Sequence, residues 1–460
     1  MIHTNGHLRG YEALKDTAKA LGKPIPELLV LARQNDPFFC GTPAQTDTAE
    51  WFVSLWQRFG YSSGIHLRRV HYQLVSQHRP TKHNGEPYEN TELCWDYLCA
   101  AGKYARSLGL IDAHAFEDHR NADPMLHVFY TERYEPYLQK PDWIDFELPS
   151  IESDIAWDLS FRVPGVHVGG YEYSTSDQPY HIEVWAEKST MNDVLLPVCQ
   201  RFGVNLVTSI GFQSITSSVE LLQRVSASGK PARVLYISDF DPAGDSMPVA
   251  VARQVEYWRA TYAPGAEIKL QPIVLTAEQV RGYTLPRIPI KESDKRKGAF
   301  QDRYGEGAVE LDALEALYPG QLARIVTEAI LPYRDLQLEQ RHREAEARAA
   351  QRAKEQWQHL TGPYQTELSV LERQAREIVQ GYEEHLSELG VNLEQDLAPI
   401  AQRLEAVRLA IQDLASDFEP ALPVLPEPQA PGQEESGWLF DSERDYFEQL
   451  AVYKRRKVAE

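Results

Sequence analysis

Three apolar segments in the middle of the chain, each followed by polar residues, are typical of buried parallel strands. They are Ile182–Ala186, Val204–Thr208 and Val234–Ile237. Helical patterns over 191–202 and 214–227 separate them. The order strand, helix, strand, helix, strand predicts a doubly wound α/β unit. Its crossover connections place all three strand ends on one edge of a parallel sheet flanked by helices.

Beyond residue 333 the apolar positions are spaced by threes and fours. Gln337–His359 predicts a long solvated helix, and two heptad-like series follow it, interrupted at Gly390 and Asn392. Their apolar positions are Leu368, Leu371, Ala375, Ile378, Tyr382, Leu386 and Leu389, then Leu393, Leu397, Ile400, Leu404, Val407, Ile411 and Leu414. This pattern predicts an antiparallel helical hairpin, with Pro399 delaying or kinking the second helix. The hairpin is either a self-packed arm or a surface for dimerisation or partner docking, and the sequence favours neither.

The flanking regions are also mainly helical in pattern. Two short helices at 11–21 and 26–33 precede helices at about 49–59, around Arg68, and at 90–107, with an extended stretch at 125–130. Three helices and an extended wing are consistent with a winged-helix module, for which 143–149 forms an acidic exit linker. At the other end, a Pro-rich tether at 420–431 leads to an amphipathic helix that ends in the basic run 454–457. That helix either docks a partner or folds back.

The ends of two predicted strands carry carboxylates. Glu187 follows the first strand, and Asp239 and Asp241 follow the third. Residues two apart on extended chain point the same way, so the three carboxylates converge where open α/β sheets bind ligands. Their mutual repulsion calls for a cation, most economically Mg²⁺. A single Asp-x-Asp pair also caps helices and lines turns, so the alternative at this motif alone is a structural one.

The combination of motifs resembles the Toprim domain, and within it the A subunit of topoisomerase VI and the related meiotic double-strand-break protein. Those proteins carry Glu-Lys and Asp-x-Asp-Pro-x-Gly where this chain has Glu187-Lys188 and Asp239–Gly244. The segments Val207–Phe212 and Val309–Leu314 are also similar to theirs. The resemblance implies that Asp239 and Asp241 hold Mg²⁺, and that Glu187 shares the metal or acts as general acid and base.

The same family places a winged-helix domain before Toprim, with an Arg-x-x-Tyr-Tyr motif whose second Tyr attacks DNA. This chain has Arg68 and Tyr72 at the matching offset, with His71 in place of the first Tyr. Independently, the segment from Trp51 to Gly85 contains no acidic residue but several Arg, Lys and His, as a polyanion-binding surface requires.

A tyrosine phenol is a weak nucleophile at neutral pH until a nearby guanidinium and a metal assist it. The resemblance therefore implies that Tyr72 forms a tyrosyl–DNA ester while Arg68 supports the phosphate. The structural alternative is that Tyr72 packs on the apolar face of its helix with Leu67, Val70 and Leu74. His71 departs from the family pattern and is either a proton acceptor for Tyr72 or an ordinary exposed histidine.

Composition limits the cellular location and the partners that we expect for this protein. The formal net charge is −20 over 460 residues, and the four cysteines are too few for a disulfide framework. No apolar stretch is long enough to span a bilayer, and the first residues show no signal sequence, so we expect a cytoplasmic, nucleoid-associated protein without membrane partners. No Walker-type nucleotide motif is present, so strand passage requires a separate ATPase subunit.

Together these observations predict five parts. They are an N-terminal helical segment at 1–50, a winged-helix domain at 51–150, a Toprim domain at 151–332, a coiled-coil hairpin at 333–417, and a tether with terminal helix at 418–460. The predicted function is Mg²⁺-dependent cleavage and rejoining of double-stranded DNA by a homodimer. One alternative is a Toprim nuclease that uses water, resembling the overcoming-lysogeny-defect group. Another is a non-catalytic DNA-binding or assembly factor.

Overall fold

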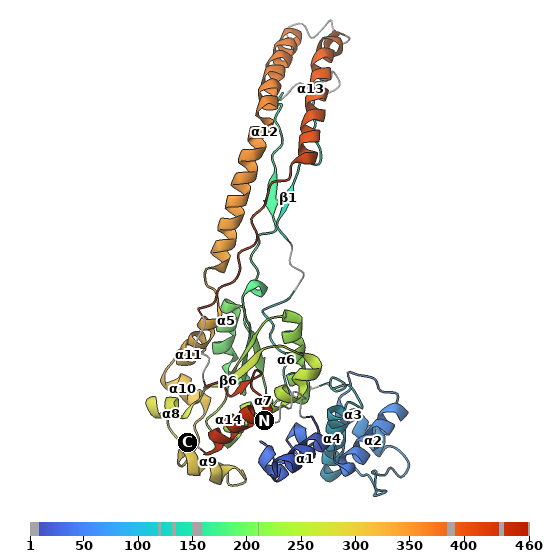
Figure 1. Cartoon of the computed structure of the whole chain (residues 1–460), viewed down its shortest axis with the longest axis vertical. Helices are drawn as coiled ribbons and strands as arrows, with labels where there is room; N and C mark the ends of the chain where they lie inside the picture. The colour runs from blue at the N-terminus through green and yellow to red at the C-terminus, as the bar shows by residue number, and fades with distance from the viewer. Residues whose placement is uncertain are drawn as a thin grey trace. The chain divides into compact units, whose positions relative to one another are not determined.

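The computed structural model describes residues 9–117, 121–130, 135–149, 159–209, 211–383, 392–431 and 437–458. These residues form two compact units (Figure 1). Unit 1 contains the described residues of 1–130, 175–335 and 429–460, and unit 2 those of 131–174 and 336–428. The predicted five-part division therefore does not coincide with the compact units, because each unit is assembled from separate stretches of chain.

Unit 1 is built on a five-stranded sheet in the order β4-β3-β5-β6-β7. The strands are β3 (His181–Ala186), β4 (Asn205–Thr208), β5 (Ala232–Ile237), β6 (Ile268–Val274) and β7 (Phe440–Asp441). The first four run parallel, and β7 pairs antiparallel with β6. The prediction of a parallel α/β sheet is confirmed, whereas β6 and β7 were not predicted.

Helices cover both faces of this sheet (Figure 1). α6 (Ile215–Ser228) and α7 (Pro242–Tyr262) pack in one apolar core, and α5 (Asn192–Phe202) and α11 (Gln321–Ile330) pack in the other. Alternating side chains of a strand enter opposite cores, as Val184 and Trp185 of β3 do. The remaining elements around the sheet are η3 (Thr175–Asp177), η4 (Ser189–Met191), α8 (Ala277–Gly282), α9 (Lys297–Tyr304), α10 (Leu311–Leu317), η5 (Leu331–Tyr333) and α14 (Tyr446–Val458).

The N-terminal part of unit 1 is helical. Its elements are α1 (Tyr11–Leu21), η1 (Ile25–Leu28), η2 (Pro37–Phe39), α2 (Pro43–Arg58), α3 (Leu67–Val75) and α4 (Glu92–Ser107). α2, α3 and α4 share one apolar core, and isolated bridges join Ile65 to Phe116 and Thr81 to Pro87. The helix predicted at 26–33 is wrong beyond Leu28, because the backbone N–H groups of Val30 and Leu31 donate to the Asp36 carboxylate instead of continuing a helix.

Unit 2 is a helical hairpin with a short strand pair. α12 (Leu338–Glu383) and α13 (Asn392–Asp417) lie side by side, and β1 (Tyr137–Gln139) pairs antiparallel with β2 (His167–Gly169) (Figure 1). The described members of the predicted heptad series are buried or half-buried in one core, except Leu414, which lines a surface pocket. The predicted turn at Gly390 lies outside the described residues. The stretch predicted as an exit linker instead contributes Ile144, Phe146 and Leu148 to this core.

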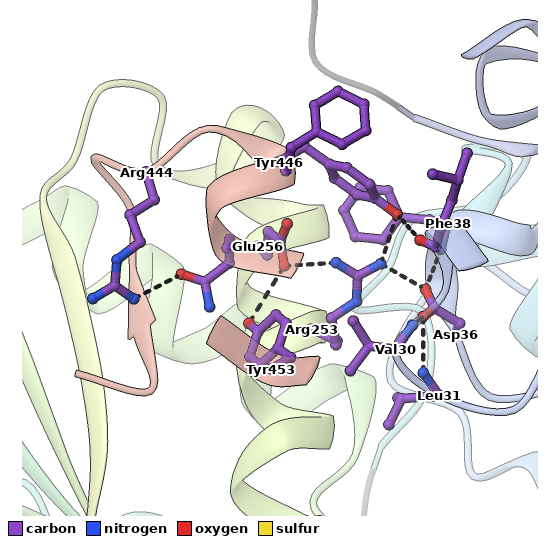
Figure 2. Close-up of polar contacts among 12 residues, drawn as sticks. Val30, Leu31, Asp36, Phe38, Arg253, Glu256, Arg444, Tyr446 and Tyr453 are labelled. Atoms are coloured by element: carbon purple, nitrogen blue, oxygen red, sulfur yellow. Dashed lines mark hydrogen bonds and ion pairs between the residues drawn. The ribbon is translucent and has the colours of Figure 1, made fainter. Parts of the chain in front are cut away.

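A buried charge cluster centred on Arg253, here called the Arg253 cluster, connects three segments of unit 1 that are distant in sequence (Figure 2). The Arg253 guanidinium on α7 donates to Asp36 at 3.0 Å, to Glu256 at 2.8 Å and to the Tyr446 hydroxyl of α14 at 3.2 Å. It also lies over the ring of Phe38, with 4.0 Å to the centroid. Arg253 and Asp36 are both fully buried, so neither charge is screened by solvent.

We expect Arg253→Leu to lower the free energy of unfolding by about 3–5 kcal/mol, because it leaves Asp36 and Glu256 buried without their counter-ion. The midpoint of urea unfolding, followed by tryptophan fluorescence, measures this loss. Arg281→Leu removes an exposed guanidinium and is the matched control, with an expected change within about 0.5 kcal/mol. Equal effects of the two substitutions would contradict a stabilising role for the Arg253 cluster.

Candidate functional site

The candidate carboxylates lie at the carboxyl edge of two neighbouring parallel strands. β3 and β5 are in register at Ala186 and Ile237, and the N–H of Glu187 donates to the carbonyl of Ile237 at 3.0 Å. The residues that follow these two strands therefore meet at the same place. Asp239 and Asp241 follow β5, and Asp241 is the N-cap of α7.

The turn between β5 and α7 is tightly packed. The N–H of Gly244 donates to the Asp241 carboxylate at 2.6 Å, which caps the helix. A Cβ atom at Gly244 would lie 2.1 Å from the carbonyl oxygen of Asp239. Only glycine fits there, so the Asp-Pro-x-Gly sequence holds the two aspartates in a fixed turn.

The structure brings Glu187 and Asp239 together. The backbone N–H of Asp239 donates to the Glu187 carboxylate at 3.2 Å. The Asp239 carboxylate itself is only 7% exposed and accepts the N–H of Leu311 at 2.8 Å, at the start of α10. This contact connects the turn after β5 with 309–314, the segment that sequence analysis had singled out only by resemblance.

Lys188 is a site residue to which sequence analysis assigned no role. Its ammonium lies 2.8 Å from Asp239, 2.9 Å from Glu310 and 3.2 Å from Asp312. No sequence spacing links Lys188 to Glu310 and Asp312, because the fold brings these residues together from more than a hundred positions apart. The ammonium supplies positive charge to a group of otherwise acidic side chains.

The electrostatics of the site favour an added cation. Burial, together with the nearby charges of Asp239 and Asp241, raises the pKa of Glu187 to about 7. Burial also raises the pKa of Asp239, although Lys188 and the Leu311 N–H oppose that shift. Raised carboxyl pKa values show that the ionised forms are destabilised, and a divalent ion between the carboxylates would reverse this.

The donor set is made of carboxylate oxygens, which suits Mg²⁺ rather than a thiol- or imidazole-bound metal. Within the described ranges, no group of three or more His, Cys, Asp and Glu side chains is arranged to enclose a metal ion as it stands. Mg²⁺ usually keeps several waters and needs one or two carboxylates, a demand that Asp239 and Asp241 meet. Direct ligation by Asp239 requires Lys188 to move away from the Oδ2 atom.

We expect the metal-free protein to lose stability relative to Glu187→Gln as the pH rises from 5 to 8. The Glu187 carboxyl has a pKa of about 7 when folded and 4.5 as a free side chain, so the folded protein binds the extra proton. The bound proton's contribution to the free energy of unfolding is present in full below pH 4.5 and is lost as the pH rises through 7. The expected loss is roughly 1–3 kcal/mol. Urea unfolding in a chelator at both pH values measures it. A relative gain in wild-type stability toward pH 8 would contradict the raised pKa.

Tyr72 lies on the solvent face of α3. Its side chain is 55% exposed, whereas Val70, His71 and Leu74 are buried in the helical core. The alternative that Tyr72 packs on the apolar face with Leu67, Val70 and Leu74 is therefore wrong. The ring that occupies that face is His71.

His71 is neither exposed nor placed as a proton acceptor for Tyr72. One ring nitrogen lies 2.8 Å from the Tyr88 hydroxyl, and the other lies 3.0 Å from the Asn90 side-chain oxygen. Its ring meets that of Tyr72 edge-on, 5.3 Å between centroids. Because both nitrogens are engaged, His71 supports the helix from within the core.

Arg68 lies one helical turn before Tyr72 and is exposed. Its guanidinium sits over the indole of Trp95 on α4, 4.7 Å from the ring centroid. Within the part of the chain that the structure describes, no carboxylate pairs with it. A guanidinium held on an aromatic face and left without a counter-ion is suited to binding phosphate.

The predicted basic surface is present around α3. Arg58, Arg68, Arg69 and Arg79 are exposed, and the half-buried Lys82 pairs with Glu86 at 3.0 Å. Among the described residues, no hydrogen bond or ion pair joins Tyr72 or Arg68 to Glu187, Asp239 or Asp241. One chain therefore holds two separate candidate groups, the tyrosine with its arginine and the carboxylates with Lys188.

Two further findings complete the description. No described helix is both long enough and apolar enough to cross a membrane. Comparison of the chain with protein-family models and with curated protein sequences finds no match.

Proposed function

We propose that this protein is a Mg²⁺-dependent enzyme that cleaves and rejoins double-stranded DNA through Tyr72, in the manner of a topoisomerase VI A subunit. The observation that carries the proposal is the meeting of Glu187 and Asp239 at the sheet edge, with Asp241 on the following helix cap. The exposed Tyr72 supports it, together with Arg68, which has no carboxylate partner among the described residues. The corresponding domain assignments, winged helix and Toprim, are part of the same proposal.

In the proposed reaction, the Tyr72 phenol oxygen attacks a backbone phosphorus. The phenol gives its proton to solvent as a tyrosyl–phosphate bond forms, the bond from phosphorus to one sugar oxygen breaks, and that oxygen takes up a proton. Arg68 stabilises the charge that develops on the phosphate. Glu187, whose carboxylate accepts the backbone N–H of Asp239 at the sheet edge, is the proposed donor of that proton and its acceptor on rejoining. Mg²⁺ on the aspartates would neutralise and orient the phosphodiester.

Cutting both strands requires two such centres, so the proposal includes a homodimer. A homodimer also accounts for the separation of Tyr72 from the carboxylates of its own chain. The tyrosine of one protomer would act at the carboxylates of the other. Cleavage exchanges one phosphoester for another and consumes no ATP. Strand passage would need a separate ATPase subunit.

The separation of Tyr72 from the carboxylates also favours a second candidate, a nuclease in which water attacks at the same metal. The two differ in their products. Water leaves free DNA ends, whereas Tyr72 leaves protein attached to the DNA.

Supercoiled plasmid incubated with the protein and Mg²⁺, then stopped with denaturant, tests the proposal. We expect nicked or linear DNA that carries bound protein until a protease removes it, and no product when EDTA replaces Mg²⁺. Cleaved DNA without bound protein would favour the nuclease. Plasmid that is bound but never cut would contradict both and leave a non-catalytic DNA-binding factor.

A further inference from the structure

The basic run at 454–457 belongs to α14, which folds back onto unit 1. β7 precedes this helix and extends the sheet at β6. The side chains of Leu450 and Tyr453 are buried in the same core as α6 and α7. Of the two roles that the sequence left open for the terminal helix, the structure shows that it folds back.

The Arg253 cluster holds α14 in place (Figure 2). Tyr446 accepts from Arg253 at 3.2 Å and donates to the Leu28 carbonyl at 2.5 Å. Tyr453 is buried and donates to Glu256 at 3.4 Å. Tyr446 and Tyr453 lie two helical turns apart, and the basic run begins directly after Tyr453. The position of the basic run relative to α7 is therefore well defined.

The last turn of α14 reaches the first turn of α7. The Arg456 guanidinium lies 3.5 Å from the Asp245 carboxylate. Asp245 is four residues beyond Asp241, about 6 Å along the helix axis. It also contacts Arg303 of α9 at 3.1 Å. Positively charged side chains from two elements therefore meet at Asp245, about one helical turn from Asp241.

Most of the positive charge of this turn is not neutralised by carboxylates of the described residues. Lys454 donates to the backbone carbonyl of Glu27, and Arg455 is exposed without an ion pair among the described residues. Among the described residues, Arg456 has one carboxylate partner, Asp245 at 3.5 Å, which Arg303 contacts more closely at 3.1 Å. A basic turn in which Arg455 is exposed and Lys454 and Arg456 are half-buried, in a chain whose net charge is −20, is suited to a polyanion.

We infer that the last turn of α14 binds the phosphodiester backbone of the nucleic acid on the α7 side of the carboxylate site. This inference rests on the proposed function and adds a second contact surface, remote in sequence from α3. Lys454, Arg455 and Arg456 would bind phosphates beside the carboxylates of their own chain, whereas Arg68 and the surface around it would bind phosphates next to Tyr72. Cations in the last turn also stabilise a helix by interacting with its dipole. The test must distinguish this purely structural role from phosphate binding.

The test compares two triple variants of the full-length protein that each remove three positive charges. One is Lys454→Gln/Arg455→Gln/Arg456→Gln. The control is Arg348→Gln/Arg352→Gln/Lys354→Gln, which changes three exposed residues of α12. Affinity for a labelled 30-base-pair duplex is measured in EDTA over a series of KCl concentrations, together with the melting temperature of each protein.

We expect the α14 variant to bind about tenfold more weakly at moderate salt, and the slope of log Kd against log salt to fall by between about one and three, since each lost phosphate contact removes about 0.9 from it. The α12 control should keep the wild-type slope. A helix-dipole role alone would lower the melting temperature and leave the slope unchanged, which overturns the inference. Should the triple variant fail to fold, Arg455→Gln alone must lower the slope by about one, and an unchanged slope overturns the inference again.

The outcomes also separate this inference from the proposed function. If the wild type binds the duplex and the α14 variant matches the control, only the inference is wrong. If the wild type does not bind the duplex, the proposed function is wrong and the inference is wrong with it.

Discussion

Tyr72→Phe is expected to abolish the covalent protein–DNA complex completely while the protein stays folded. The substitution removes only the hydroxyl, which forms no hydrogen bond among the described residues, from a side chain that is 55% exposed. Its melting temperature should therefore equal that of the wild type. The measurement is the amount of plasmid that carries denaturant-resistant protein after incubation with Mg²⁺.

Tyr104→Phe is the matched control. Tyr104 lies on α4 of the same helical region, is half-buried, and its hydroxyl also has no hydrogen-bond partner among the described residues. This variant should form the covalent complex at the wild-type level. Adducts that persist in Tyr72→Phe would exclude Tyr72 as the nucleophile, and cleavage that persists without adducts would point to water.

Asp239→Asn and Asp241→Asn should each slow Mg²⁺-dependent cleavage by about a hundredfold or more. Both keep the shape of the side chain and its ability to accept the Leu311 or Gly244 N–H, so the turn is retained. Each removes a negative charge that would hold the metal, whose stabilisation of the transition state is worth several kcal/mol, and each 1.36 kcal/mol is about tenfold in rate. The initial rate of plasmid cleavage, measured over a range of Mg²⁺ concentrations, tests this.

Asp312→Asn supplies the comparison for these two variants. Asp312 contacts the same Lys188 but is about half exposed, and its position beyond Lys188 keeps it out of the proposed metal ligands. A rate within a fewfold of the wild type is expected for this variant. If all three substitutions had the same small effect, cleavage could not depend on a metal held by Asp239 and Asp241.

The strands that carry the site were predictable because their residues are buried on both faces. β3 and β5 are mainly apolar, although Glu183 and Arg233 interrupt them, so their ends, and Glu187 and Asp239 with them, could be placed on one edge from the sequence alone. β6 mixes Lys269, Gln271 and Pro272 with its apolar residues, and β7 has only two residues. Neither pattern distinguishes a strand from a loop.

The polar contacts of the site were not predictable, because they depend on tertiary approach. Lys188 meets Glu310 and Asp312, and Arg253 meets Asp36 more than two hundred positions away, with no periodicity to reveal either. Helical spacing was informative for α3, but it did not assign faces correctly. Leu67, Val70, His71 and Leu74 fall on one stripe, which leaves Tyr72 outside it, and a polar imidazole was not expected in an apolar core.

The completion of the sheet by β7 has a consequence for biosynthesis. β6 is made long before β7, and the whole of α12 and α13 is translated between them. Throughout that interval Lys269 and Leu270 of β6 lack the strand that pairs with them in the finished sheet, a condition that promotes aggregation of edge strands. We therefore expect truncated chains that end between α13 and β7 to depend on chaperones, even though these chains contain every residue proposed for cleavage.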